Sequence, residues 1–181
     1  MYALIYLRNI DAQKRRELEQ ETAATKDALT GVFNRKSFQY QVEMHMKERE
    51  DSADSTMILM DGDNFKQIND TYGHAEGDQV IKQLSQILLK TFRRKDVIGR
   101  FGGDEFMIFL RNVTDREIIN RRLEEFRTEL SKNGSYGITC SIGIATVKKE
   151  DFSYEKAFKE ADEALYQSKR AGKNRYSYYE A

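Results

Sequence analysis

The sequence predicts an α+β fold, with a central, mostly antiparallel sheet flanked by helices. Two apolar runs, 97–101 and 106–110, are joined by Gly102-Gly103 and an acidic residue, which is typical of a β-hairpin because glycine adopts the backbone angles of a tight turn without strain. A continuous apolar run at 56–60 and an alternating stretch at 137–147 predict two further strands. Helix-forming segments separate these strands, and the resulting order is that of a ferredoxin-like sheet.

Composition limits the classes of protein to which the chain can belong. Its 181 residues suit one domain of ordinary size with a short appendage. Lysine plus arginine and aspartate plus glutamate number 30 each, so we expect neither nucleic acid nor an anionic membrane as a partner of this segment. The single cysteine, Cys140, excludes an internal disulfide and favours a reduced, cytoplasmic setting. No apolar run approaches the roughly 20 residues that cross a bilayer.

Residues 1–26 are predicted to form a strand and a linker helix at the end of an upstream sensor domain. An apolar start is followed, at 11–28, by a charged, glycine-free stretch that is rich in helix formers. Because this stretch has few apolar residues, it can be either a solvated N-terminal helix or a signalling helix that leads from an upstream domain. The second interpretation draws on residues 6–10, which resemble the end of a PAS sensor domain.

A helix is predicted at 35–50, directly after a turn. Gly31 fits the end of the linker helix, and Asn34 fits the N-cap of the new one. Apolar residues then recur at four-residue steps, which is the spacing of a buried helix face; they are Phe38, Val42 and Met46. His45 lies off this stripe and is expected at the surface.

Acidic residues follow the predicted strands at one edge of the sheet. Asp61-Gly62-Asp63 ends the first buried strand, and Asp104-Glu105 stands at the hairpin turn. A ferredoxin-like sheet places that strand beside the hairpin, so three or four carboxylates are expected in one small volume. Such a group repels itself unless a cation neutralises it, and we therefore expect a divalent metal there.

Amphipathic segments predict the remaining helices and a last strand. A turn at 71–78 leads into a long helix with one apolar face, made of Val80, Ile81, Leu84, Ile87 and Leu88. Two further helices are predicted at 115–132 and 152–171, and a final strand at 175–179. In the strand at 137–147, one covered face is expected to carry Ile138, Cys140, Ile142 and Ile144.

Several charged residues also admit a purely structural explanation. Asp78 in the first turn of a helix and Lys169 at the end of another would complement the helix dipole. As a bare pattern, Arg93-x-x-Asp96 is typical of a surface ion pair. Lys173 lies beyond a glycine, so helix capping does not explain it.

Five short motifs recur in a fixed order between residues 27 and 178. They are Asp27-x-Leu29-Thr30-Gly31-x-x-Asn34-Arg35, Asp61-x-Asp63-x-Phe65-Lys66-x-x-Asn69-Asp70, Gly73-His74-x-x-Gly77-Asp78, Gly102-Gly103-Asp104-Glu105-Phe106 and Ala164-Leu165-Tyr166-x-x-Lys169. Together they resemble the GGDEF family, the diguanylate cyclases. The resemblance implies a nucleotidyl-cyclase palm, with the catalytic domain at 27–181.

The resemblance implies that two GTP molecules condense into cyclic di-GMP with release of two pyrophosphates. It implies Mg²⁺, or Mn²⁺ in its place, held by Asp61, the carbonyl of Gly62 and Asp104. Asp104 is also the position of the proton acceptor, with Glu105 in support, and Lys66 is that of the transition-state stabiliser. The family usually has an aliphatic residue where this chain has Gly62. The product has two-fold symmetry and one site holds one GTP, so activity implies a homodimer.

The remaining implied roles concern the binding of substrate and product. Asn69 and Asp78 resemble the pair that reads guanine, since a carboxylate accepts hydrogen bonds from N1–H and the 2-amino group, which adenine cannot offer. The other substrate positions are His74, Gly102, Gly103, Lys169 and Lys173, the two lysines being those that contact the β- and γ-phosphates. Arg93 and Asp96 stand at the spacing of an inhibitory product site for cyclic di-GMP.

Three alternatives stay open. An idle domain could sense GTP or cyclic di-GMP without turnover, although the intact carboxylates and Lys66 argue against it. A related cyclase could make a mixed guanine–adenine product, which the presence of Asp78 disfavours. A non-enzymatic dimerisation module would leave the carboxylates at the sheet edge unexplained.

Overall fold

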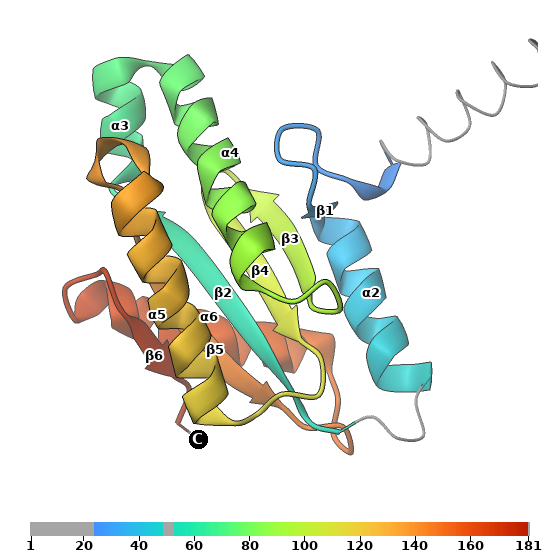
Figure 1. Cartoon of the computed structure of the whole chain (residues 1–181). Helices are drawn as coiled ribbons and strands as arrows, with labels where there is room; N and C mark the ends of the chain where they lie inside the picture. Colours follow the sequence, from blue (N-terminus) through green and yellow to red (C-terminus); the bar gives the residue numbers. More distant parts are fainter. Residues whose placement is uncertain (1–23, 49–52, 181) are drawn as a thin grey trace, which may run out of the picture.

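The computed structural model describes residues 24–48 and 53–180 as a sheet with helices on both faces (Figure 1). The strand and most of the linker helix predicted at 1–26 lie outside the described residues. The strands are β1 (Phe33–Asn34), β2 (Ser55–Asp63), β3 (Val97–Gly102), β4 (Glu105–Leu110), β5 (Thr139–Val147) and β6 (Tyr176–Tyr178). The helices are α2 (Arg35–Glu48), α3 (Phe65–Tyr72), α4 (His74–Thr91), α5 (Arg116–Asn133) and α6 (Tyr154–Arg170).

The six strands form one sheet in the order β1-β3-β4-β2-β5-β6. The four central strands are antiparallel neighbours, while the edge strands β1 and β6 pair in parallel with β3 and β5. This order confirms the predicted α+β fold with a mostly antiparallel, ferredoxin-like sheet. It also confirms that the first long strand lies beside the hairpin, with Asp61 directly opposite Glu105.

Helices cover both faces of the sheet and divide the core into two parts (Figure 1). On one face, α4 and α5 bury residues such as Leu84 and Leu123 against the sheet. On the other face, α2 and α6 bury Phe38 and Leu165. The central strand β2 therefore contacts apolar side chains on both faces, which explains why its sequence is a continuous apolar run.

The structure corrects four local predictions. Strand β5 is covered on both faces and not on one, because Ala145 and Val147 pack in the α2–α6 half of the core. The predicted surface residue His45 is 7 % exposed, with Nε2 3.0 Å from Asn112 Oδ1. The segment after Asp63 includes the short helix α3, and α4 begins at His74. The linker helix ends before residue 26, not at 28.

The predicted N-cap of α2 is confirmed, since Asn34 Oδ1 accepts a hydrogen bond from the backbone N–H of Ser37 at 3.0 Å. In the part of the chain that the structure describes, no helix is both long enough and apolar enough for a bilayer crossing.

Candidate active site

The candidate site lies where β2 ends beside the turn between β3 and β4. Gly103 adopts a φ of 51°, a left-handed value that a tight turn needs and glycine allows. The backbone N–H of Gly62 donates to the carbonyl of Asp104 at 3.3 Å. A Cβ atom at Gly62 would stand 3.0 Å from Asp104 Oδ2, so the missing side chain leaves room for this carboxylate.

Carboxylates repel one another at this edge. Burial, and next the charge of Asp61, raise the pKa of Asp104 from 3.8 to about 6, and Glu105 adds to the shift. Burial and the charge of Asp61 likewise raise the pKa of Glu105. A cation partly offsets this charge, since Lys169 Nζ lies 2.7 Å from Asp61 Oδ2. The site therefore holds more negative charge than its own lysine neutralises, and an added cation would be favoured.

Asp63 does not join these carboxylates, so the group at this edge consists of three, Asp61, Asp104 and Glu105, which is the smaller of the two predicted sizes. The Asp63 side chain is buried and accepts hydrogen bonds from Thr139 Oγ1 at 2.7 Å, Ser141 Oγ at 2.6 Å and the backbone N–H of Asn174 at 2.9 Å. Among residues 24–48 and 53–180, no group of three or more His, Cys, Asp or Glu is arranged to hold a metal. Asp63 instead ties β2 to β5 and to the loop after α6.

The oxygen atoms that remain still suit a hard divalent cation. Asp61 and Asp104 supply two carboxylates, and Gly62, whose backbone N–H donates to the carbonyl of Asp104, is the predicted source of a third oxygen through its own carbonyl. Mg²⁺ is commonly held by one or two carboxylates, with water and substrate phosphates completing its shell. The space beside Gly62 supports the fit, because it lets the Asp104 carboxylate approach the end of β2. Burial and the charge of Asp61 also raise the pKa of Asp104, and a bound cation would offset both.

The corner between α3 and α4 brings the predicted guanine-reading residues together. Asn69 Oδ1 is buried and has no hydrogen-bond partner within the described part of the chain, and it lies where a side chain at Gly77 would stand, 1.9 Å from an added Cβ. Asp78 follows Gly77 and is exposed, as are His74 and Lys66. A buried acceptor without a partner is uncommon in proteins and is often found where a ligand binds.

The two predicted phosphate-binding lysines come from the end of α6 and the loop that follows. Lys169 contacts Asp61, as described above. Lys173 adopts a φ of 62° and donates from Nζ to Asn64 Oδ1 at 2.7 Å, just before α3. Lys169 therefore lies against the end of β2, and Lys173 against the residue that joins β2 to α3.

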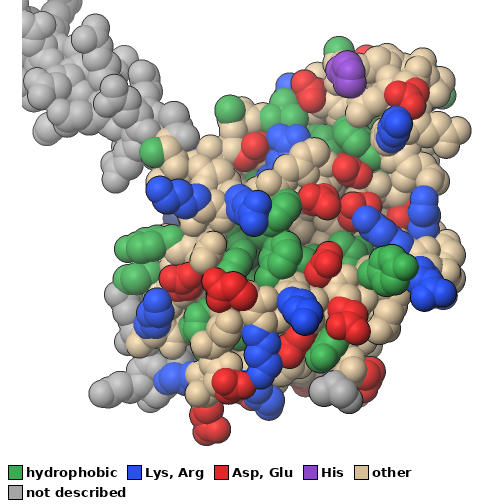
Figure 2. Space-filling model, turned by 180° about the vertical axis from the view of Figure 1, so that it is seen from behind, with side chains coloured by type: hydrophobic (Ala, Val, Ile, Leu, Met, Phe, Trp, Pro, Cys, Tyr) green, Lys and Arg blue, Asp and Glu red, His purple; other side chains and the backbone are tan. Residues whose placement is uncertain are grey.

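The surface on the other side of the molecule is mixed in character. Hydrophobic, acidic and basic side chains lie next to one another on the face opposite that of Figure 1 (Figure 2). No broad patch of one charge is visible on the described part of this face, which agrees with equal numbers of acidic and basic residues.

Comparison with known proteins identifies the family. The profile described as "Diguanylate cyclase, GGDEF domain" matches residues 24–175. The chain belongs to the GGDEF-domain family. This result confirms the resemblance drawn from the five motifs.

Two curated relatives and one solved structure illustrate the similarity. The chain is 36% identical to "Diguanylate cyclase DgcM" of Escherichia coli (strain K12), over 95% of this chain and 42% of the relative. It is 37% identical to "Diguanylate cyclase DgcP" of Pseudomonas aeruginosa (strain PAO1), over 87% of this chain and 24% of that protein. The chain thus spans less than half of either relative. The crystal structure of the coiled coil and GGDEF domain of DgcB from Caulobacter crescentus, in complex with c-di-GMP, has a TM-score of 0.84 and 31% identity, and covers 97% of each chain.

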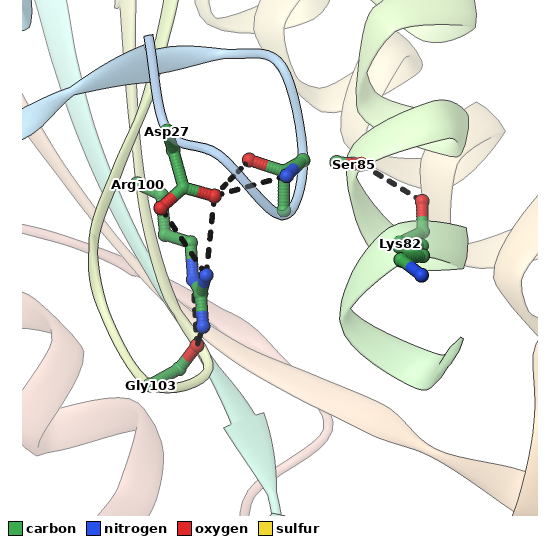
Figure 3. A network of polar contacts seen from close by, with 6 residues as sticks. Asp27, Lys82, Ser85, Arg100 and Gly103 are labelled. Atoms are coloured by element: carbon green, nitrogen blue, oxygen red, sulfur yellow. Dashed lines mark hydrogen bonds and ion pairs between the residues drawn. The ribbon is translucent and has the colours of Figure 1, made fainter. Parts of the chain in front are cut away.

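A polar network ties the hairpin turn of this GGDEF domain to the start of its first motif (Figure 3). Arg100 donates from Nε and Nη2 to the carbonyl of Gly103, at 2.9 and 2.8 Å, and its Nη1 pairs with Asp27 Oδ1 at 3.1 Å. Asp27 also accepts from the hydroxyl of Thr30 at 2.6 Å. Our sequence reasoning did not identify this pair, although an arginine inside the otherwise apolar strand β3 was a usable signal.

Arg93 and Asp96, predicted for a product site, do not pair through their side chains. Arg93 is exposed, whereas the Asp96 side chain is 0 % exposed and lies 2.9 Å from Nη1 of Arg122 on α5. Asp96 Oδ2 also accepts from the backbone N–H of Arg93 at 3.0 Å. The surface ion pair suggested by the bare pattern is therefore wrong, because the partner of Asp96 comes from another helix.

The buried Asp96–Arg122 pair gives a stability prediction. Replacing Arg122 by methionine leaves a buried carboxylate without its cation, so we expect the free energy of unfolding to fall by about 3 kcal/mol. Urea unfolding measures this loss. The matched control is Arg121→Met at the exposed neighbouring position, where we expect a change within about 0.5 kcal/mol. Equal effects of the two substitutions would contradict a role for the buried pair.

Proposed function

We propose that this GGDEF domain condenses two GTP molecules into cyclic di-GMP and two pyrophosphates, with the domain boundary at residue 27. The observation that carries the proposal is the meeting of carboxylates at the end of β2 and the hairpin turn, next to the α3–α4 corner. The names of the curated relatives and the c-di-GMP complex of the similar crystal structure support the same reaction.

The reaction needs charge neutralisation and a positioned nucleophile more than covalent catalysis. The metal would be Mg²⁺ or Mn²⁺, held by Asp61, Asp104 and the carbonyl of Gly62. When bound, such an ion offsets the negative charge of the phosphates during attack of a ribose 3′-hydroxyl on an α-phosphorus. Asp104, supported by Glu105, is the proposed acceptor of the hydroxyl proton.

Other side chains would hold the nucleotide. Asn69 and Asp78 would bind the Watson–Crick edge of guanine. Asn69 Oδ1, to which none of the described residues donates, would then gain a donor. Lys66, exposed on α3, would stabilise the charge that develops on the transferring phosphate. Further contacts to substrate are assigned to His74, Gly102, Gly103, Lys169 and Lys173.

The phosphate-binding role of Lys169 implies an exchange of partners. Its ammonium group lies 2.7 Å from Asp61, a proposed metal ligand. Binding of metal and GTP would offer Asp61 a divalent partner and Lys169 a phosphate. The side chain of Lys169 is 36 % exposed, so it has room to make this change.

We also propose regulation by product and by an upstream sensor domain. Arg93 is exposed and can donate to cyclic di-GMP, while Asp96 holds the backbone N–H of Arg93 in place. Signals from the sensor domain would arrive through the linker helix and reach the hairpin turn through Asp27 and Arg100.

The half-site arrangement predicts that activity depends on protein concentration. One site binds one GTP, so two protomers must face each other about a two-fold axis before a product forms. On about a hundredfold dilution we expect the rate per subunit to fall at least severalfold. Chromatography of the nucleotides measures the rate per subunit at each protein concentration. A rate per subunit that stays constant while the protein dissociates would rule out half-sites.

The same assay tests the reaction itself. Concentrated protein with GTP and Mg²⁺ should yield cyclic di-GMP, and ATP should not compete. GTP binding without any product would favour an idle, sensing domain. Absence of both binding and product would overturn the proposed function.

A further inference from the structure

The α3–α4 corner carries the proposed guanine-reading residues but is weakly held to the core. Helix α3 has eight residues, of which only Ile68 is buried. The first turn of α4 is exposed, up to the buried Gly77. Because Asn69 lies on α3 and Asp78 on α4, the angle between the two helices decides whether both side chains can contact one base.

A short segment from another part of the chain, 134–137, contacts both helices of this corner. The ring of Tyr136 stacks on that of Tyr72 at the end of α3, with centroids 4.3 Å apart and planes inclined by 30°. The hydroxyl of Tyr136 donates to Glu76 Oε2 on α4 at 2.8 Å. A third contact lies further along α4, where Gln83 Oε1 accepts from the backbone N–H of Ser135 at 3.1 Å.

The 134–137 segment is itself fixed to the core on both sides. The backbone N–H of Gly134 donates to the carbonyl of Leu130 at the end of α5, at 2.7 Å. On the other side Ile138 is 4 % exposed within the α4–α5 half of the core. Tyr136 is thus carried by a firmly attached segment and reaches out to the less firmly attached corner.

The backbone of Tyr136 adopts an unfavourable conformation. Its φ of 58° and ψ of 19° place it in the left-handed region, which is rare for a bulky aromatic residue. Such a conformation persists when surrounding contacts over-determine it, and it is often found at functional sites. A cavity of about 280 Å³ lies between α3 and this segment, lined by Gln67, Thr71, Tyr72, Tyr136 and Ile138 among others. Because side chains do not fill the space between α3 and the 134–137 segment, the stacked rings of Tyr72 and Tyr136, which line this cavity, join the helix to the segment.

We propose that Tyr136 is a positioning residue that holds the α3–α4 corner in the geometry for reading guanine. It acts on Asn69 through Tyr72 and on Asp78 through Glu76, and it does not contact the nucleotide. The inference rests on the proposed function, because it assigns the guanine edge to Asn69 and Asp78.

The test compares three variants with the wild-type protein. Tyr136→Asn removes the ring but keeps a residue that tolerates the left-handed backbone, so the fold is not strained further. Tyr136→Phe keeps the stack and loses only the hydrogen bond to Glu76. The matched control is Tyr40→Asn on α2, which removes a tyrosine that is 58 % exposed, against 43 % for Tyr136, from the other face of the sheet.

Calorimetric titration with Mg²⁺ gives Kd for GTP and for ITP, which lacks the 2-amino group of guanine. For Tyr136→Asn we expect Kd for GTP to rise about tenfold, with a reduced preference for GTP over ITP and an unchanged or higher Tm. For Tyr136→Phe we expect a rise of about threefold. Tyr40→Asn should bind GTP like the wild type.

Two outcomes overturn the inference without touching the proposed function. One is wild-type Kd and wild-type preference for GTP over ITP in Tyr136→Asn. The other is a loss of Tm in Tyr136→Asn with no change in that preference, which would make Tyr136 a merely structural residue. If the wild-type protein itself binds no GTP, the proposed function and this inference fall together.

Discussion

Replacement of Asp104 by asparagine is expected to abolish cyclic di-GMP formation. The amide has nearly the same shape but cannot neutralise a divalent cation, and it is not a proton acceptor. Because both proposed roles disappear together, we expect the rate to fall by at least about a thousandfold. Chromatography of reaction products at saturating GTP and Mg²⁺ measures this loss.

The same substitution is expected to stabilise the metal-free protein near neutral pH. The pKa of Asp104 is raised from 3.8 to about 6 in the folded chain, so folding is penalised once the carboxylate ionises. The penalty is absent below pH 3.8, grows as the pH rises and is complete above about pH 6. Because the side chain is only partly buried, solvent screening reduces the gain from Asp104→Asn to roughly 1–2 kcal/mol above that pH.

Unfolding in urea with EDTA, at about pH 4 and about pH 8, measures this difference between variant and wild type. The matched control is Asp54→Asn, because hydrogen bonds from Lys148 and Lys149 lower the pKa of Asp54. Asp54 therefore favours folding at neutral pH, and its removal should change stability in the opposite direction and leave the activity unaltered. An Asp104→Asn variant that is less stable than wild type at about pH 8 would show that burial and the charge of Asp61 do not penalise the ionised carboxylate.

Substitution of Gly77 by alanine is expected to impair GTP binding, although alanine is the better helix former by about 1 kcal/mol. The new Cβ would lie 1.9 Å from Asn69 Oδ1 and 3.1 Å from the ring of Phe65. Asn69 must then leave its position beside Gly77. Losing one polar contact to the base corresponds to a rise in Kd of about ten- to a hundredfold.

Binding of GTP to four variants tests this explanation. If Gly77→Ala acts through Asn69, its effect and that of Asn69→Ala should not add in the double variant. Gln79→Ala, at an exposed position of the same helix, serves as the control. Additive effects, or wild-type affinity in Gly77→Ala, would show that the glycine does not position Asn69.

Local patterns in the sequence determined the fold class and much of the site. Continuous apolar character predicted β2, a Gly-Gly turn predicted the β3–β4 hairpin, and four-residue spacing predicted the buried face of α2. These features depend on neighbours a few residues apart, so they can be read along the chain. Because hairpin and strand order follow from them, the sequence also predicted that Asp61 and Asp104 meet, as they do.

Side-chain partners from distant parts of the chain were decided by the tertiary structure alone. Asp63 lies two residues from Asp61, yet it faces Thr139 and Ser141 on β5 and leaves the acidic group. Asp96 pairs with Arg122 on α5 and not with nearby Arg93.

The contacts Arg100–Asp27, Lys169–Asp61 and Tyr136–Tyr72 likewise join segments between 64 and 108 residues apart. Such pairs form only after the sheet and its helices have packed, because packing decides where each side chain points. The sequence by itself therefore determined the long strands and helices, though not β1 or α3, and it determined which edge carries the acids. The tertiary structure decided which of those acids remain free for a cation and which side chains hold the site in place.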